Sequence, residues 1–62
     1  MQNKIKARRE ELRMTQEELA EKANISRQTV HVLETGKAEN VLMSTMIAIA
    51  RALKSTVDEI FL

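Results

Sequence analysis

Arg27 and Gln28 are adjacent residues whose side chains can each make two parallel hydrogen bonds to one planar partner. An arginine can donate to O6 and N7 of guanine, and a glutamine can pair with N6 and N7 of adenine. Each such pair discriminates against a wrong base by about 1–3 kcal/mol. Val32, about one helical turn beyond Gln28, could contact the methyl group of thymine or simply pack loosely at the surface. On an isolated helix Arg27 and Gln28 would be ordinary solvated residues, so their interpretation depends on the elements that carry them.

The residue types that catalysis and metal binding need are scarce in this sequence. There is no cysteine and one histidine, His31, and there is no glycine-rich phosphate loop or cluster of ligating side chains. No nucleophile stands beside a base at a usable spacing. We therefore expect no enzyme activity, no cofactor, no metal and no small-molecule ligand. His31 could meet a phosphate when it is charged, but a lone surface histidine more often has no such role.

The composition is that of one small helical domain, residues 1–62. The chain has no proline and one glycine, Gly36, which favours helices over turn-rich structure. Ten basic against nine acidic residues give a net charge of +1, which by itself argues little for a nucleic-acid partner. No apolar run approaches the roughly 20 residues of a membrane span, so we expect a cytoplasmic protein without a membrane partner. So short a chain has marginal stability, which favours a homodimer.

Caps and apolar spacing predict the first two helices. A helix over about 3–12 carries charge on most of its surface. Thr15 and Glu18 then form a capping box, in which the threonine hydroxyl accepts from the glutamate amide while the glutamate side chain reaches back. This box predicts a second helix over 16–23.

A tight connection leads to the third helix. Asn24 can end the second helix in the left-handed conformation, and Ser26 can cap a third helix over about 27–35. The two capped helices are joined by about three residues, and Ala20 is small where they must cross. This arrangement predicts a helix-turn-helix over about 16–35.

Two further helices are predicted after a loop over 37–41. The fourth has apolar residues at helical spacing, and these are expected to supply the bulk of the core: Met43, Met46, Ile49, Ala50 and Leu53. The chain's four methionines are interpreted as core filling. Thr56 and Glu59 form a second capping box, which opens a short fifth helix that returns Ile60, Phe61 and Leu62 to the domain.

Taken together, these segments resemble the Cro and phage-repressor (XRE) helix-turn-helix family over nearly the whole chain. The matching segments are TQEELA at 15–20, ISRQTV at 25–30, LETGK at 33–37, IARAL at 49–53 and VDEIF at 57–61. The resemblance implies an all-α, five-helix, lambda-repressor-like DNA-binding domain. It also implies a homodimer on double-stranded DNA, with operator half-sites about one helical turn, roughly 34 Å, apart.

The resemblance also assigns roles to single residues. Arg27, Gln28 and Val32 stand at the positions that contact bases. Phosphate contacts in the family map to positions around the helix-turn-helix, namely Gln16, Ser26, Thr35 and Lys37. Arg9 and Glu34 are implied to form an internal ion pair that ties the first helix to the third. Residual apolar side chains suggest the dimer contact, namely Ile47, Ile60, Phe61 and Leu62.

The sequence departs from the family pattern at four positions. Arg13 and Asn24 stand where many members have glycine, which predicts two slightly strained helix ends, and Lys54 replaces another frequent glycine. Leu42 stands where a serine or similar residue usually caps the fourth helix.

The leading hypothesis is a sequence-specific transcriptional repressor. Two alternatives remain open at this point. One is a protein-interaction module, such as an antitoxin-like partner that binds DNA only secondarily. The other is a structural nucleoid protein without sequence preference, which would bind all duplexes equally, whereas a repressor should prefer its operator by about a thousandfold or more.

Overall fold

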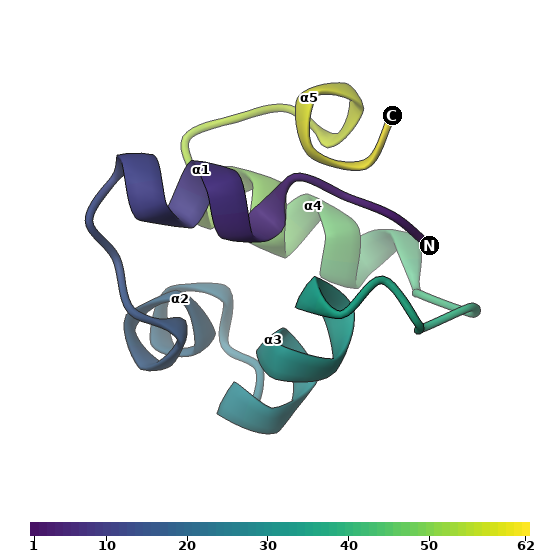
Figure 1. Ribbon diagram of the computed structural model, residues 1–62, viewed down its shortest axis with the longest axis horizontal. Helices are drawn as coiled ribbons and strands as arrows, with labels where there is room; N and C mark the ends of the chain where they lie inside the picture. The colour runs from purple at the N-terminus through teal and green to yellow at the C-terminus, as the bar shows by residue number, and fades with distance from the viewer.

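The computed structural model describes residues 1–62 and consists of five helices joined by short loops. The helices are α1 (Ile5–Glu11), α2 (Gln16–Ala23), α3 (Arg27–Glu34), α4 (Met43–Ala52) and α5 (Val57–Phe61). Helix α2 packs against α3 and α4, while α5 packs against α4 and α1 (Figure 1). The all-helical, five-helix prediction is confirmed. No helix has the length and apolar character needed to cross a membrane.

Helices α2 and α5 begin at a residue whose side chain accepts a hydrogen bond from a free backbone amide of the first turn. Thr15 and Thr56 each form a complete capping box, with Glu18 and Glu59 respectively, as predicted. Both boxes place a carboxylate on a backbone N–H, which holds the pKa of each glutamate below its usual value. Helix α4 begins after Leu42, whose side chain makes no capping hydrogen bond. The helix therefore lacks the cap that a serine usually supplies at this position in the family.

Three helices end on a residue in the left-handed region. Arg13, Asn24 and Lys54 have φ values of 54°, 57° and 54°. The left-handed conformation is unfavourable for any residue with a Cβ, but the energetic penalty is smaller for asparagine than for arginine or lysine. Strain was predicted at Arg13 and Asn24, and the backbone confirms it there; Lys54, where the family often has glycine, adopts the same conformation.

All five helices contribute to the core. Its fully buried large side chains are Ile5, Leu19, Val30, Ile49, Leu53 and Ile60. Helix α4 supplies Ile49 and Ala50, as predicted, but Met43 is 57% exposed. The prediction that all four methionines fill the core is wrong for Met43 and for Met1, which is 40% exposed, whereas Met14 is buried and Met46 packs half-buried against the core. Spacing placed Met43 on the inner side of α4, but that side is not covered by other helices at its first turn.

Candidate nucleic-acid interface

Helix α3 is attached to the protein by one side and leaves the other side open. Val30 and Leu33 are buried, whereas Arg27, Gln28 and Val32 are exposed. Val32 is 43% exposed, so its methyl groups are available to a partner. The structure therefore brings the three predicted base-contacting residues together on one open helix face.

The connection between α2 and α3 fixes the angle of that face. Asn24 adopts φ 57° and ψ 45°, a left-handed conformation that ends α2 and turns the chain toward α3. The amide of Ile25 donates to the carbonyl of Ala20 at 3.0 Å, and this bond closes the turn. Ala20 and Ala23 are buried, and their small side chains allow the two helices to approach. The predicted helix-turn-helix is thus formed by α2 and α3.

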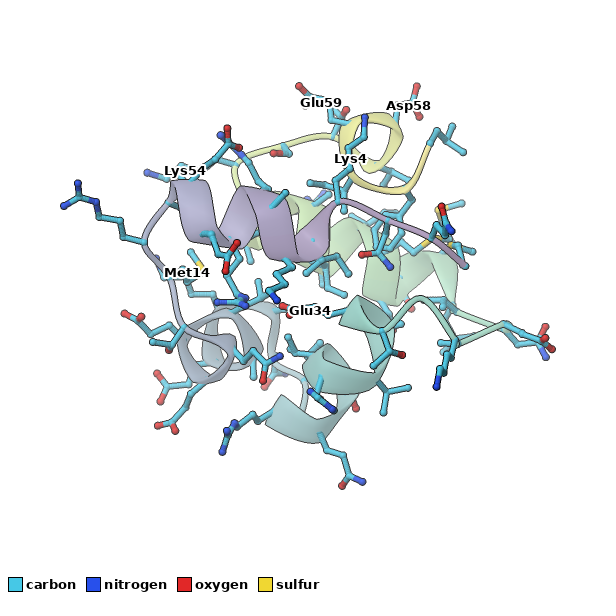
Figure 2. All side chains as sticks on the ribbon, in the orientation of Figure 1. Lys4, Met14, Glu34, Lys54, Asp58 and Glu59 are labelled. Atoms are coloured by element: carbon cyan, nitrogen blue, oxygen red, sulfur yellow. The ribbon has the colours of Figure 1, made fainter.

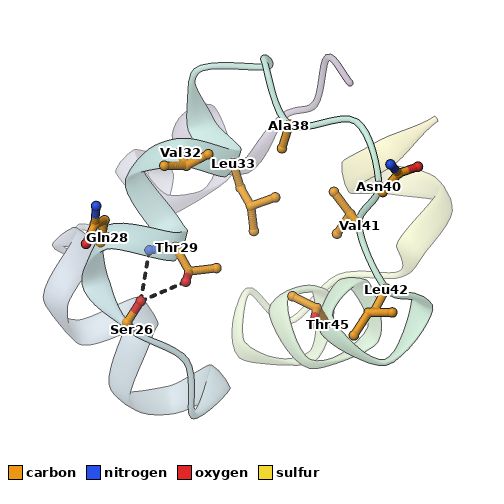
Figure 3. A pocket seen from close by; sticks show the side chains of 10 residues that line it. All are labelled: Ser26, Gln28, Thr29, Val32, Leu33, Ala38, Asn40, Val41, Leu42 and Thr45. Carbon is orange, nitrogen blue, oxygen red and sulfur yellow. Dashed lines mark hydrogen bonds between the residues drawn. The ribbon is translucent and has the colours of Figure 1, made fainter.

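Ser26 acts as the amino-terminal cap of α3. Its hydroxyl oxygen accepts a hydrogen bond from the amide of Thr29 at 3.0 Å and lies 2.7 Å from the Thr29 hydroxyl (Figure 3). Ser26 was predicted as a phosphate contact. Its side chain is exposed, but its hydroxyl oxygen already accepts the hydrogen bond that caps α3. The cap orients the first turn, where Arg27 and Gln28 lie.

An internal ion pair anchors the other end of α3, and Figure 2 labels its carboxylate, Glu34, between α1 and α3. The Nε of Arg9 donates to Glu34 Oε2 at 2.7 Å, and Arg9 Nη2 donates to Glu34 Oε1 at 3.2 Å. Arg9 Nη1 also donates to the carbonyl of Met14 at 2.7 Å. The two side chains are only 12% and 5% exposed, so most of the pair is removed from water. The structure brings together the two residues that the family resemblance paired.

Gln16 belongs to the same network. Its amide Nε2 donates to Glu34 Oε1 at 3.0 Å, so Gln16 is half-buried and is held by α3. Burial acts to raise the pKa of Glu34, but hydrogen bonds from Arg9 and Gln16 and the charges of Arg9 and Lys6 outweigh it, so the pKa is lowered. Sequence reasoning treated Gln16 only as a phosphate contact, because nothing local signals a partner 18 residues away.

Thr35 and Lys37 lie on the exposed segment just after α3. The hydroxyl of Thr35 donates to the carbonyl of Val32 and accepts from the amide of Lys37. The amino group of Met1 donates to the carbonyls of Gly36 and Ala38 at 2.7 and 2.6 Å. This contact between the start of the chain and the loop after α3 had no sequence signal. It helps to fix the segment that carries Lys37.

A groove of about 470 Å³ runs along the flank of α3 that faces the loop and the start of α4 (Figure 3). Val32 and Leu33 line it from α3, and Val41, Leu42 and Thr45 line it from the other side. Val32 therefore borders both the open face of α3 and an adjoining hollow.

Comparison with known proteins identifies the fold family. The helix-turn-helix family model matches residues 5–60. The chain belongs to the Cro/C1-type helix-turn-helix family. An uncharacterized HTH-type transcriptional regulator of Methanothermobacter thermautotrophicus is 41% identical over 63 residues, which span all of this chain and 90% of that protein. A protein of Archaeoglobus fulgidus with the same description is 37% identical over 62 residues, which span all of this chain and 86% of that relative.

The predicted dimer residues of this helix-turn-helix protein separate into two groups. Ile60 and Phe61 are only 2% and 7% exposed, because α5 turns them onto the core of their own chain. Their assignment to a dimer contact stays a prediction, because burial within one chain does not test a contact with a second copy. Ile47 and Leu62 are exposed.

Proposed function

We propose that this protein is a sequence-specific transcriptional regulator that places α3 in the major groove of duplex DNA and represses by occupying its operator. The observation that carries the proposal is the open face of α3, with Arg27 and Gln28 in its first turn. Val30 and Leu33 hold the opposite side to the body of the domain. A helix of this diameter fits the major groove, where each base pair presents a distinct pattern of donors and acceptors. The transcriptional-regulator descriptions of the two relatives support the same conclusion.

Arg27 and Gln28 are assigned to base recognition, and Val32 to a thymine methyl group. The residues assigned to phosphates are Gln16, Ser26, Thr35 and Lys37. They flank α3 at both of its ends, as expected for contacts to the two backbones that border the groove. Base contacts would set sequence preference, while the phosphate contacts would set position and salt dependence.

A homodimer would present two such faces related by two-fold symmetry, and its operator would then be pseudo-palindromic. The apolar side chains suited to this contact are Leu42, Met43, Ile47 and Leu62, with exposures of 70%, 57%, 36% and 89%. We expect an Ile47→Lys, Leu62→Asp double variant to sediment as a monomer and to remain helical, because both side chains lie outside the core. A double variant that still sediments as a dimer would refute this surface.

Selection of bound duplexes from a random pool tests the proposed function directly. The wild-type protein should enrich one symmetric sequence. Arg27→Ala should change the preferred base at one position of each half-site, whereas Lys37→Gln should weaken all duplexes alike and reduce the salt slope by about one. Lys22→Gln, at the exposed end of α2, is the matched control for loss of a charge.

Two outcomes would contradict the proposal as a whole, and a third would contradict one residue assignment. Equal binding of all duplexes would indicate a structural nucleoid protein. No salt-sensitive DNA binding, together with a stoichiometric protein partner, would indicate an interaction module instead. An unchanged preferred sequence in Arg27→Ala would show that the assigned base contact is wrong.

A further inference from the structure

The segment before α1 runs toward the loop that follows α3, and one of its side chains bonds to the main chain of that helix (Figure 1). The Nδ2 group of Asn3 donates to the carbonyl oxygen of Leu33 at 2.7 Å. The two residues are 30 positions apart in the sequence, and the bond is partly buried. Leu33 lies in the last turn of α3, so this contact ties α1 to the helix that carries the proposed base contacts.

The side-chain amide of Asn3 uses all of its hydrogen-bonding groups. Its oxygen Oδ1 accepts from the amide of Ile5 at 3.1 Å, which makes an Asx turn at the start of α1. Its nitrogen donates to the carbonyls of Leu33 and Met1 at 2.7 and 3.2 Å. The opposite orientation of the amide would place its oxygen against two carbonyl oxygens. Asn3 therefore acts on α1 through its oxygen and on α3 through its nitrogen.

The backbone that carries Asn3 is itself held in place. Ile5 is fully buried in the core. The amide of Lys4 donates to the carbonyl of Ile60 on α5 at 2.8 Å. A donor on a fixed backbone restrains its acceptor, whereas a donor on a mobile segment would move with it. The bond from Asn3 can therefore restrain α3.

The last turn of α3 is held to α1 in two different ways. The ion pair with Arg9 holds the side chain of Glu34. Three rotatable bonds separate that carboxylate from the main chain, so the backbone can shift slightly while the ion pair persists. The bond from Asn3 acts directly on the main chain of the preceding residue, Leu33. Its loss should allow small rotations of α3 that the ion pair alone does not prevent.

Small rotations of α3 should affect base contacts more than phosphate contacts. A bidentate pair needs two hydrogen bonds in good alignment at once, and hydrogen bonds weaken steeply as their angle closes. Phosphate contacts depend mainly on charge and carry no sequence information. A misaligned α3 would therefore keep general affinity for DNA and lose discrimination between bases.

We propose that Asn3 is a positioning residue for base recognition, because its bond to Leu33 holds α3 in the orientation in which Arg27 and Gln28 can read bases. The inference rests on the proposed function, since it concerns the helix that enters the major groove. The net contribution of one ordinary hydrogen bond corresponds to roughly two- to tenfold in an equilibrium constant. Without the bond, the aligned population and the preference for the operator should fall by about this factor.

Two substitutions separate the two roles of Asn3. Asn3→Asp and Asn3→Ser both keep an oxygen that can accept from Ile5, so the start of α1 is preserved. Neither can donate to Leu33, because a carboxylate has no hydrogen and the serine hydroxyl is one bond shorter than the amide. Gln2→Glu is the matched control, since it makes the same amide-to-carboxylate change at the adjacent exposed residue.

The first measurement is discrimination between two duplexes, recorded by fluorescence anisotropy at pH 7. One is the duplex selected from the random pool, and the other has one base pair changed in one half-site. We expect both Asn3 variants to lower the ratio of the two affinities by about two- to tenfold, whereas Gln2→Glu keeps the wild-type ratio. A merely structural role would reduce the folded fraction and weaken both duplexes alike, which would leave the ratio unchanged.

The second measurement is amide hydrogen exchange and needs no DNA. The amides of Glu34 and Thr35 should exchange about two- to tenfold faster in Asn3→Ser, because the last turn of α3 opens more often. The amide of Ile5 should keep its wild-type rate, because the serine oxygen still accepts from it. Unchanged exchange at the end of α3 would show that the bond does not hold the helix and would overturn the inference.

The inference and the proposed function fail in different ways. If the wild-type protein prefers the selected duplex and both Asn3 variants keep its ratio, the positioning role is wrong. If Asn3→Asp and Gln2→Glu lower the ratio equally while Asn3→Ser does not, the effect is one of charge and the positioning role is also wrong. If the wild-type protein shows no preference between duplexes, the proposed function itself fails, and hydrogen exchange then decides whether Asn3 holds α3.

Discussion

Replacing Arg9 with methionine should destabilise the protein far more than loss of an ordinary charge. The substitution keeps much of the aliphatic packing of Arg9 but leaves Glu34, 5% exposed, with Gln16 as its only side-chain donor. It also removes the donor to the carbonyl of Met14. Stranding one member of a buried pair costs about 3–5 kcal/mol. A 62-residue domain has about 3–9 kcal/mol in total, so Arg9→Met should lose at least about a third of its stability.

Urea denaturation followed by far-ultraviolet circular dichroism at pH 7 and fixed protein concentration measures this loss. Glu11→Gln is the control, because the 3.6 Å pair between Arg8 and Glu11 is exposed and its loss should cost less than about 1 kcal/mol. An Arg9→Met, Glu34→Leu double variant should recover much of the stability, since no charge is then stranded. The reasoning is refuted if Arg9→Met loses under about 1 kcal/mol, or if the double variant is no more stable than Arg9→Met.

Three further predictions follow from the backbone, the core and the capping carboxylates. Lys54→Gly should raise stability by up to about 1 kcal/mol and the melting temperature by several degrees, because φ is 54° there and glycine adopts it freely; an unchanged or lower Tm would contradict this. Ala20→Leu should cost about 1–3 kcal/mol and weaken DNA binding, because the added volume separates α2 from α3; a stable variant with wild-type affinity would contradict it. The pKa values of Glu18, Glu34 and Glu59 are lowered in the folded state, so their stabilisation is complete above the ordinary value of 4.5 and should be lost as the pH falls through the lower folded values. A free energy of unfolding that stays constant from pH 6 to pH 3 in urea titrations would contradict this last expectation.

Features that depend on neighbouring residues could be predicted from the sequence. The caps at Thr15, Ser26 and Thr56 each involve a partner three residues away, so the chemistry of a short segment was enough. The left-handed residues at Arg13 and Lys54 were found only by comparison with a family pattern that has glycine there.

Features that depend on distant residues were predicted less well. The bond between Gln16 and Glu34 has no local signal, and the contact of the Met1 amino group with the loop after α3 has none either. Helical spacing indicated which side of α4 is apolar, but it could not show that Met43 lies beyond the covering helices. Ile60 was assigned to a dimer contact because it is apolar and near the end of the sequence, whereas α5 packs it against the core.

The open face of α3 is held at three points, and this matters for recognition. The Ser26 cap fixes its first turn, Val30 and Leu33 fix its middle, and the pair between Arg9 and Glu34 fixes its last turn. A helix of eight residues has little stability of its own, so its orientation has to come from these contacts. Because the helix is ordered before any partner binds, the backbone entropy of forming α3 need not be lost on binding. Under the proposed function, the buried ion pair therefore contributes to base recognition without touching a base.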